Sequence, residues 1–195
     1  MDIRAWRRRL RDYDEITNVG PIIRRYFVIG AFDGALTVLG IIIGASAVGA
    51  AEEHRALILS ASIGASIALS VSSAVGAYEA ERVEKKLDVR TIERALLARL
   101  SEEHKEAFRF AAILSAIVHG IAPLIAALLP VLPFAFLDIP SATIAAIVIT
   151  LVILFLLGAY LGNLVRERIL VTGLRFVAAG LGTAGILWLF GARPI

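Results

Sequence analysis

The residues of this chain that could do chemistry are a few polar side chains set inside long apolar stretches, and Asp33 is the first of them. Asp33 follows Arg25 by about eight positions, which places it roughly 12 Å along a helix, too deep for its short side chain to reach water. A charged side chain at a bilayer centre costs roughly 2.5–3.5 kcal/mol on insertion scales. We therefore interpret Asp33 as a cation-binding carboxylate at a helix seam. A protonated or hydrogen-bonded structural Asp is the alternative.

Small and hydroxyl side chains accompany Asp33 at helical spacing. On its own segment, residues that share its face recur every three or four positions and would let another helix approach closely: Gly30, Thr37, Gly40 and Gly44. The next apolar segment carries a serine stripe at the same spacing: Ser62, Ser66, Ser70 and Ser73. The stripe could line a path with Asp33, and it fits ordinary small-residue helix packing equally well.

One histidine, His119, lies near the middle of a third apolar segment. The unperturbed pKa of imidazole is near neutrality, so His119 could relay protons or bind a metal ion. A lone histidine inside a membrane is more often a hydrogen-bond partner between helices. We keep both roles and place His119 on the candidate path with Asp33, Thr37, Ser70 and Ser73.

Acidic side chains gather in the polar stretch between the second and third apolar segments. Glu81, Glu84 and Asp88 fall on one helical face, and further acids follow at Glu93, Glu102, Glu103 and Glu106. Carboxylates without Cys or paired His form a hard oxygen site, suited to Mn²⁺, Fe²⁺, Mg²⁺ or Ca²⁺. An ordinary solvated helix with mixed charges explains the same pattern.

These side chains must be positioned by helices in a membrane. The chain has 195 residues, of which 58% are hydrophobic and 19% charged, and it has no Cys. This composition excludes a disordered chain, a disulfide scaffold and thiolate chemistry. Five segments reach the length of about 20 apolar residues that a spanning helix needs: 27–49, 56–78, 107–129, 140–162 and 169–190. We predict an all-α, multi-pass protein of the cell membrane with five transmembrane helices.

The basic residues predict the orientation of these spans. All of the 20 Lys and Arg residues except Arg55 and Arg193 fall before the first span, between the second and third, or around the turn between the fourth and fifth. Cytoplasmic loops hold such an excess, so we expect the N-terminus inside and the C-terminus outside. Topology and anionic membrane lipid thus account for the net charge of +3. A nucleic-acid partner is not expected.

The chain divides into an N-terminal segment and a membrane domain. Residues 1–25 mix Arg with apolar side chains at helical spacing and predict an amphipathic cytoplasmic segment on the inner membrane surface. Residues 26–191 form the five-span domain, and 79–106, which lack Gly and Pro, form a short cytoplasmic helical extension within it. Gln is absent and Met1 is the single Met, which favours a thermophilic source.

Four short motifs together resemble the vacuolar iron transporter family. The run GAFDGALT at residues 30–37 is similar to the family's Asp-Gly signature in the first span. SAVGAY at residues 73–78 is similar to its Ser-Met-Ala-x-Gly-Glu-Tyr. PVLPF at 130–134 is similar to its Pro-Leu-Leu-Pro-Tyr, and TGLR at 172–175 to its Ser-Gly-Leu-Arg. The four motifs occur in order on the predicted spans, between Tyr26 and Gly191.

This resemblance implies a homodimeric carrier that moves Fe²⁺ or Mn²⁺ out of the cytosol by proton antiport, along a path at the dimer interface. Asp33 matches the family's transport acid. The family's Met ligand is replaced by Ser73, or by Ser72 with a one-residue shift, and its Glu by Ala77. The loop acids are carried over as metal-ligand candidates, with Glu79 as a stand-in for the lost carboxylate: Glu79, Glu81, Glu84, Glu102, Glu103 and Glu106.

Three functions from different classes are compatible with these features. A secondary transporter of divalent metal is favoured, with the ion as cargo and no permanently bound cofactor. A non-transporting metal-binding scaffold or sensor is the alternative, favoured by the missing Met and Glu. An enzyme is not expected, because metal-dependent lipid transferases need several Asp residues at one bilayer face and the spans offer only Asp33.

Overall fold

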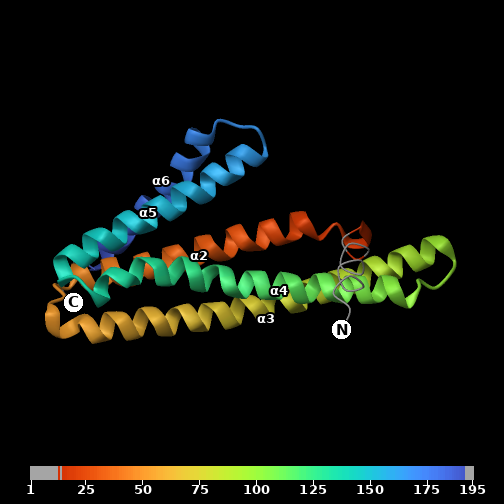
Figure 1. Ribbon diagram of the computed structural model, residues 1–195, viewed down its shortest axis with the longest axis horizontal. Coiled ribbons are helices and arrows are strands. Elements are labelled where there is room, and N and C mark those ends of the chain that lie inside the picture. The colour runs from red at the N-terminus through yellow and green to blue at the C-terminus, as the bar shows by residue number, and fades with distance from the viewer. Residues whose placement is uncertain (1–12, 14, 192–195) are drawn as a thin grey trace.

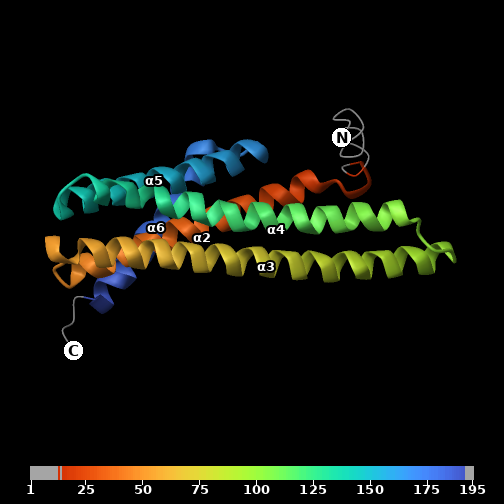
Figure 2. The same cartoon turned by 60° about the horizontal axis from the view of Figure 1, so that its bottom comes forward.

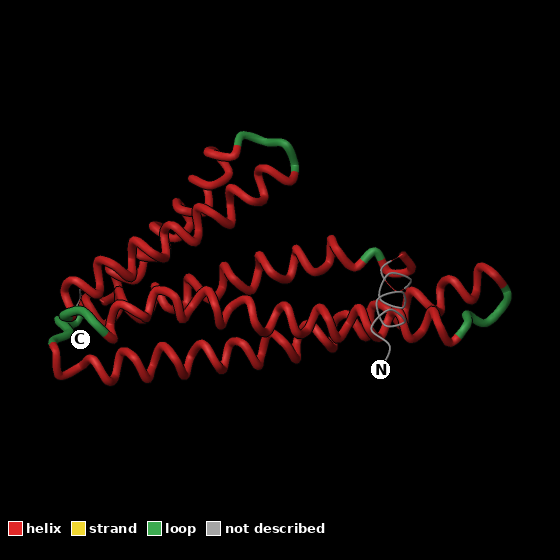
Figure 3. The backbone as a smooth tube through the Cα atoms, viewed as in Figure 1, coloured by secondary structure: helices red, strands yellow, loops and turns green. Residues whose placement is uncertain are grey.

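The computed structural model describes residues 13 and 15–191, and this part of the chain is helical almost throughout and contains no strand (Figure 3). Each of five long helices is apolar enough to cross a membrane, which confirms the predicted all-α, five-span architecture. The helices are α2 (Val19–Ala47), α3 (Arg55–Leu96), α4 (Glu102–Val131), α5 (Ile139–Leu164) and α6 (Ile169–Gly191). The short turns η1 (Glu52–His54) and η2 (Leu132–Ala135) precede α3 and follow α4.

The predicted N-terminal segment falls largely on residues 1–12 and 14, which lie outside the described part of the chain. Residues 15–17 are helical, and Asn18, with a φ of 46°, separates them from α2. The Tyr13 hydroxyl donates a hydrogen bond to Glu106 on α4 at 2.8 Å. Because α2 already begins at Val19, the boundary expected between residues 25 and 26 falls inside a helix.

Two helices are longer than a bilayer requires. The 42 residues of α3 extend about 63 Å, twice the roughly 30 Å of a hydrocarbon core. The surplus of α3 pairs with the start of α4 to form an antiparallel helical hairpin (Figure 1). Leu97, with a φ of 53°, ends α3, and the Glu93 carboxylate accepts a hydrogen bond from the Leu100 amide at 3.0 Å. The predicted helical extension at 79–106 is therefore a closed hairpin, and we call this end of the molecule the hairpin end.

The helices form a three-helix bundle and a two-helix pair. In the bundle, α4 packs against both α3 and α2. The pair of α5 and α6 joins α2 and α4 at the end opposite the hairpin, and diverges from them toward the α5–α6 turn (Figures 1 and 2). The core where the pair meets the bundle includes the buried side chains of Val38, Ile42, Phe134 and Ala142. The pair is thus anchored at one end.

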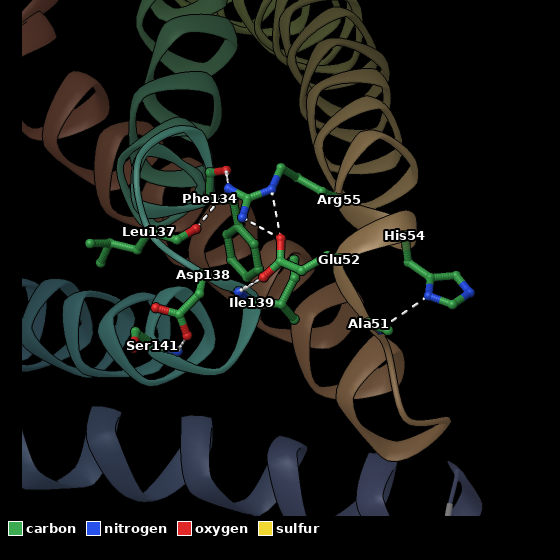
Figure 4. A network of polar contacts seen from close by, with 9 residues as sticks. All are labelled: Ala51, Glu52, His54, Arg55, Phe134, Leu137, Asp138, Ile139 and Ser141. Atoms are coloured by element: carbon green, nitrogen blue, oxygen red, sulfur yellow. Dashed lines mark hydrogen bonds and ion pairs between the residues drawn. The ribbon is translucent and has the colours of Figure 1, made fainter.

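A polar network ties this anchored end together (Figure 4). Glu52 in η1 accepts a hydrogen bond from the Ile139 amide at the start of α5, at 2.7 Å. Arg55 donates to the carbonyl oxygens of Phe134 and Leu137, each at 2.7 Å, and also pairs with Glu52. These contacts join the α2–α3 connection to the α4–α5 connection. We call Glu52, Arg55 and their three backbone partners the clasp, and this end of the molecule the clasp end.

Asp138 fixes the start of α5 beside the clasp. Its carboxylate accepts a hydrogen bond from the Ser141 amide at 3.2 Å, which caps the first turn of the helix. This hydrogen bond favours the charged carboxylate and holds the pKa of Asp138 below its ordinary value. The cap keeps α5 starting where the clasp holds Ile139.

Candidate functional site

The site is built around a seam in which α2 and α4 pack backbone against backbone. A Cβ atom at Gly34 would lie 2.2 Å from the Pro123 carbonyl oxygen, and one at Gly30 would lie 2.9 Å from Nδ1 of His119. Real side chains do not tolerate such distances, so glycine is required at both positions. The close approach predicted from Gly30 is confirmed. Gly34, next to Asp33, makes the tightest contact.

The other predicted glycines do not contribute to the seam. A Cβ atom at Gly40 would lie 3.4 Å from Leu187 on α6, which is ordinary contact, and one at Gly44 would meet nothing within 4 Å. The helix-facing stripe therefore shifts from the expected line through Gly40 and Gly44 to one through Gly30 and Gly34. A drift of this kind follows from the 3.6-residue helical repeat, because positions three and four apart do not keep one direction over several turns.

His119 crosses the seam from α4 to the backbone of α2. Its Nδ1 atom lies 2.8 Å from the carbonyl oxygen of Tyr26, and the centroids of the His119 and Tyr26 rings are 4.9 Å apart. A carbonyl oxygen only accepts, so Nδ1 carries the hydrogen, and in the neutral ring Nε2 is left as the acceptor. Gly30 makes this contact possible because it has no side chain above the ring. His119 is thus held in a defined tautomer, as a bridge between helices.

Asp33 lies half-buried on α2 beside this histidine, and its carboxyl interacts electrostatically with His119. In the described part of the chain, no hydrogen bond reaches the Asp33 carboxylate. Thr37, predicted to share its path, donates its hydroxyl to the Asp33 backbone carbonyl at 2.7 Å, so this hydroxyl serves the helix backbone. Asp33 therefore has two carboxylate oxygens that the described residues leave available.

The serine stripe of α3 faces α4. Ser62 and Ser66 are completely buried, and Ser66 donates to the Ser62 carbonyl at 2.6 Å. Ser70 donates to the carbonyl oxygen of Gly120, the residue after His119. Ser73 is half-buried. The stripe packs α3 against α4, and through Ser70 it reaches the stretch of α4 that carries His119.

Glu81 is the one charged residue of the described part that is buried, at 4% exposure. Its carboxylate lies 3.3 Å from Nη2 of Arg25 on α2. The same carboxylate also interacts electrostatically with the Tyr26 side chain. Glu84 is exposed and Asp88 is half-exposed, although sequence spacing puts all three acids on one face. Of these three acids, Glu81 is the one that pairs with Arg25 of α2, and this tertiary contact distinguishes it from Glu84 and Asp88.

The other predicted metal ligands are dispersed over the hairpin. Three of them make separate contacts: Glu79 with Arg82, Glu102 with Lys105, and Glu106 with Tyr13. Glu84 and Glu103 are exposed. Across residues 13 and 15–191, no three Asp, Glu or His side chains gather so that they could hold a metal ion. A shared ion at the hairpin would need a second chain or a rearrangement of these acids.

Sequence reasoning missed two features of the seam. Ser115, four residues before His119 and on the same face of α4, is completely buried, and its hydroxyl has no hydrogen-bond partner within the described residues. The spacing to His119 is the signal that could have found it. Pro123, four residues after His119, forms the α4 side of the contact with Gly34. The α4 face of the seam is thus Ser115, His119 and Pro123.

Five apolar spans with an available carboxylate in a glycine-lined seam define a multi-pass membrane protein with an ionisable site inside its spans. The sequence profile of the VIT family matches residues 93–192. The uncharacterized protein MJ0645 of Methanocaldococcus jannaschii is 36% identical over 165 residues, which cover 82% of this chain and 84% of the relative. The chain belongs to the VIT family, the vacuolar iron transporter family.

Membership places the protein among membrane transporters of metal ions, and not among enzymes, at the level of the family. The family and the five apolar helices make it a multi-pass membrane protein, which in an archaeal or bacterial-type member resides in the cell membrane. The expected resemblance is thereby confirmed.

Proposed function

We propose that the protein exports a divalent cation, Fe²⁺ or Mn²⁺, from the cytosol in exchange for protons, with Asp33 as its ligand inside the membrane. The observation that carries this proposal is the half-buried Asp33 carboxylate, which has no hydrogen-bond partner in the described chain and lies beside His119. A structural Asp would be expected to use its oxygens within the protein. The metal ion is the cargo, and no permanently bound cofactor is proposed.

Exchange with protons follows from the chemistry of the carboxylate. A divalent cation binds the charged form of Asp33, and protonation of that oxygen releases the cation. His119, with Nδ1 committed to Tyr26, can exchange a proton only through Nε2. The Asp33 carboxylate and Nε2 of His119 can therefore carry protons and the metal cation alternately along the same path.

We propose Glu81 as the acid that precedes Asp33 on the path from the hairpin end. Ala77 occupies the position of the family's glutamate and is buried, and Glu81 follows it by one helical turn, about 40° around the helix. Glu79, the stand-in expected from the sequence, is half-exposed and paired with Arg82. Glu81 is favoured over Glu79 because it is buried and because it lies on nearly the same side of α3 as Ala77. Glu84, Glu102, Glu103 and Glu106 would act only as outlying acids that attract the cation.

We propose a homodimer as the transporting unit, with the path at its interface. A hard divalent cation takes about six or more oxygen ligands, and one Asp33 carboxylate supplies at most two. The free face of α3 supports close approach of a second copy, because exposed small residues recur there every four positions: Ser60, Gly64, Ala68, Ser72 and Gly76. Two copies would contribute two Asp33 carboxylates. Asp33, Thr37, Ser70, Ser73 and His119 remain the proposed path residues.

Metal flux into proteoliposomes with an imposed pH gradient tests the proposal. Wild-type protein should move Fe²⁺ or Mn²⁺ and a proton in opposite directions, and Asp33→Asn should reduce flux to the level of empty vesicles. Glu53→Gln is the matched control, because Glu53 is an exposed acid at the clasp end. Asp33→Asn that transports as well as wild type would exclude Asp33 as the ligand.

The same assay separates the transporter from a metal-binding scaffold or sensor. The scaffold is favoured by Ser73 and Ala77, which lack the ligand groups of the family's Met and Glu. Metal binding that survives Asp33→Asn, without flux in the wild-type protein, would establish the scaffold.

A further inference from the structure

A feature of the hairpin is independent of the seam: the groove between its two helices. A cavity of about 710 Å³ lies between α3 and α4. It begins at Tyr78, where the second predicted span ends, and at Ala112, within the first two turns of the third, and it continues along the hairpin to Arg99. Val89 and Phe108 contribute apolar surface to its lining. The groove therefore starts near the predicted membrane boundary and extends along the hairpin.

Positive charge dominates this groove. Seven Lys and Arg side chains line it, together with a single acid, Glu93, whose carboxylate already accepts from the Leu100 amide. Three of the cations have acidic partners: Arg82 with Glu79, Lys85 with Asp88, and Lys105 with Glu102. The other four have no ion-pair partner among the described residues: Lys86, Arg90, Arg99 and Arg109. So many cations repel one another unless an anion enters.

The groove is held in shape by contacts that do not use these four cations. Lys85 lies over the Phe108 ring, 5.6 Å from its centroid, and its side chain is 16% exposed. The hairpin turn is closed by Glu93 and by the hydrogen bond from the Ala98 amide to the Glu93 carbonyl oxygen. An anion would therefore meet a preformed site, which lowers the entropic cost of binding.

We propose that this groove binds a phosphate-bearing anion, with Lys and Arg side chains holding the phosphate oxygens. Arg90 on α3 and Arg109 on α4 line it from its two walls, and a guanidinium can hold two phosphate oxygens at once. The apolar surface at Phe108 and the start of the groove at the predicted membrane boundary favour a phospholipid headgroup as the source. A soluble organic phosphate offers the same chemistry.

The test measures binding of fluorescent phosphatidylglycerol to the full chain in neutral detergent, with phosphatidylcholine and glycerol phosphate as competitors. Phosphatidylglycerol should bind, high salt should weaken it, and phosphatidylcholine should not compete. Arg90→Gln with Arg109→Gln should lower the affinity about thirtyfold, since each basic residue near a headgroup contributes about 1 kcal/mol. Arg166→Gln with Arg168→Gln is the matched control: it removes the same charge from the α5–α6 turn, outside the groove, and should leave the affinity unchanged.

The outcomes separate the two sources of phosphate. Competition by glycerol phosphate supports a soluble phosphate as the ligand, and its failure to compete supports a lipid headgroup. Equal binding of phosphatidylglycerol and phosphatidylcholine overturns the proposal. So does unchanged affinity in the Arg90 and Arg109 double variant, provided that its helical circular dichroism and elution match those of the wild-type protein.

Discussion

The clasp end and the hairpin end of the same bundle are held together by different means. At the clasp end, Arg55 and Glu52 join two connections through the backbone, above a core that includes the buried Phe134 ring. Toward the hairpin end, α5 and α6 diverge from α2 (Figure 1). A largely apolar pocket of about 660 Å³, lined by Phe27 and Tyr160 among others, lies there between α2, α4 and α5.

This difference indicates which end can move. The clasp fixes the start of α5 by the hydrogen bond from the Ile139 amide to the Glu52 carboxylate, and a hydrogen bond to a charged group is the stronger kind. At the other end, Tyr160 and residues 163–171 around the α5–α6 turn are exposed. We expect α5 and α6 to swing as a pair about the clasp, with the seam of α2 and α4 staying fixed.

The largest effect should come from the seam that both ends share. Gly34→Leu places side-chain atoms where the Pro123 backbone lies, so α2 and α4 must separate and the folded protein should be lost. Thermal unfolding in detergent, followed by circular dichroism, measures this. Gly44→Ala is the control, because its Cβ atom would meet nothing within 4 Å. A Gly34→Leu protein that unfolds at the wild-type temperature would contradict the seam.

A matched pair of substitutions tests the difference between the ends directly. Arg55→Gln removes donors to two backbone carbonyl oxygens and should lower the free energy of unfolding by about 2 kcal/mol. Arg82→Gln removes one exposed ion pair, with Glu79, and should change it by less than about 0.5 kcal/mol. If the two variants lowered the free energy of unfolding equally in denaturant, the clasp end would not be held more strongly than the hairpin end.

Hydrogen exchange should show the same gradient along a single helix. Amides of α5 near Tyr160 and Leu164 should exchange faster than amides near Ala142 and Ala146, which lie in the core beside the clasp. Mass spectrometry of peptides from the two ends of α5 measures this. Uniform protection along α5 would indicate a rigid pair and not a swinging one.

The smallest effect concerns pH at the clasp end. The hydrogen bond from the Ser141 amide lowers the pKa of Asp138. The charged carboxylate therefore stabilises the folded protein at pH values above the ordinary pKa of an Asp, and this stabilisation is lost as pH falls through the lowered pKa. Asp138→Asn, which can still cap the helix, should remove this part of the acid-side dependence. Acid unfolding curves of the two proteins should differ below about pH 4 and coincide near neutrality.

The sequence was sufficient to predict the five spans, because length and apolarity alone decide them, and a helical extension at 79–106, because these residues contain no Gly or Pro. It did not predict the turn at residues 97–101 that closes the extension into a hairpin. It also placed Asp33 beside a glycine seam. It did not identify Gly34 as the tightest contact, since the direction of a helix face depends on the crossing angle with α4. Nor did it separate buried Glu81 from exposed Glu84, because Arg25 of α2 makes that distinction and only the packing brings it there.

The unbroken course of α3 has a mechanical consequence. From Arg55 to Leu96 the helix contains no proline, and its last glycine is Gly76, so nothing in the stretch beyond can act as a joint. The hairpin is therefore a rigid lever that carries Glu81 and continues into the span that carries Ser70. A load applied at the hairpin turn, by a lipid or by a bound molecule, acts on these residues as a torque, and a probe attached at the turn would report the tilt of the span.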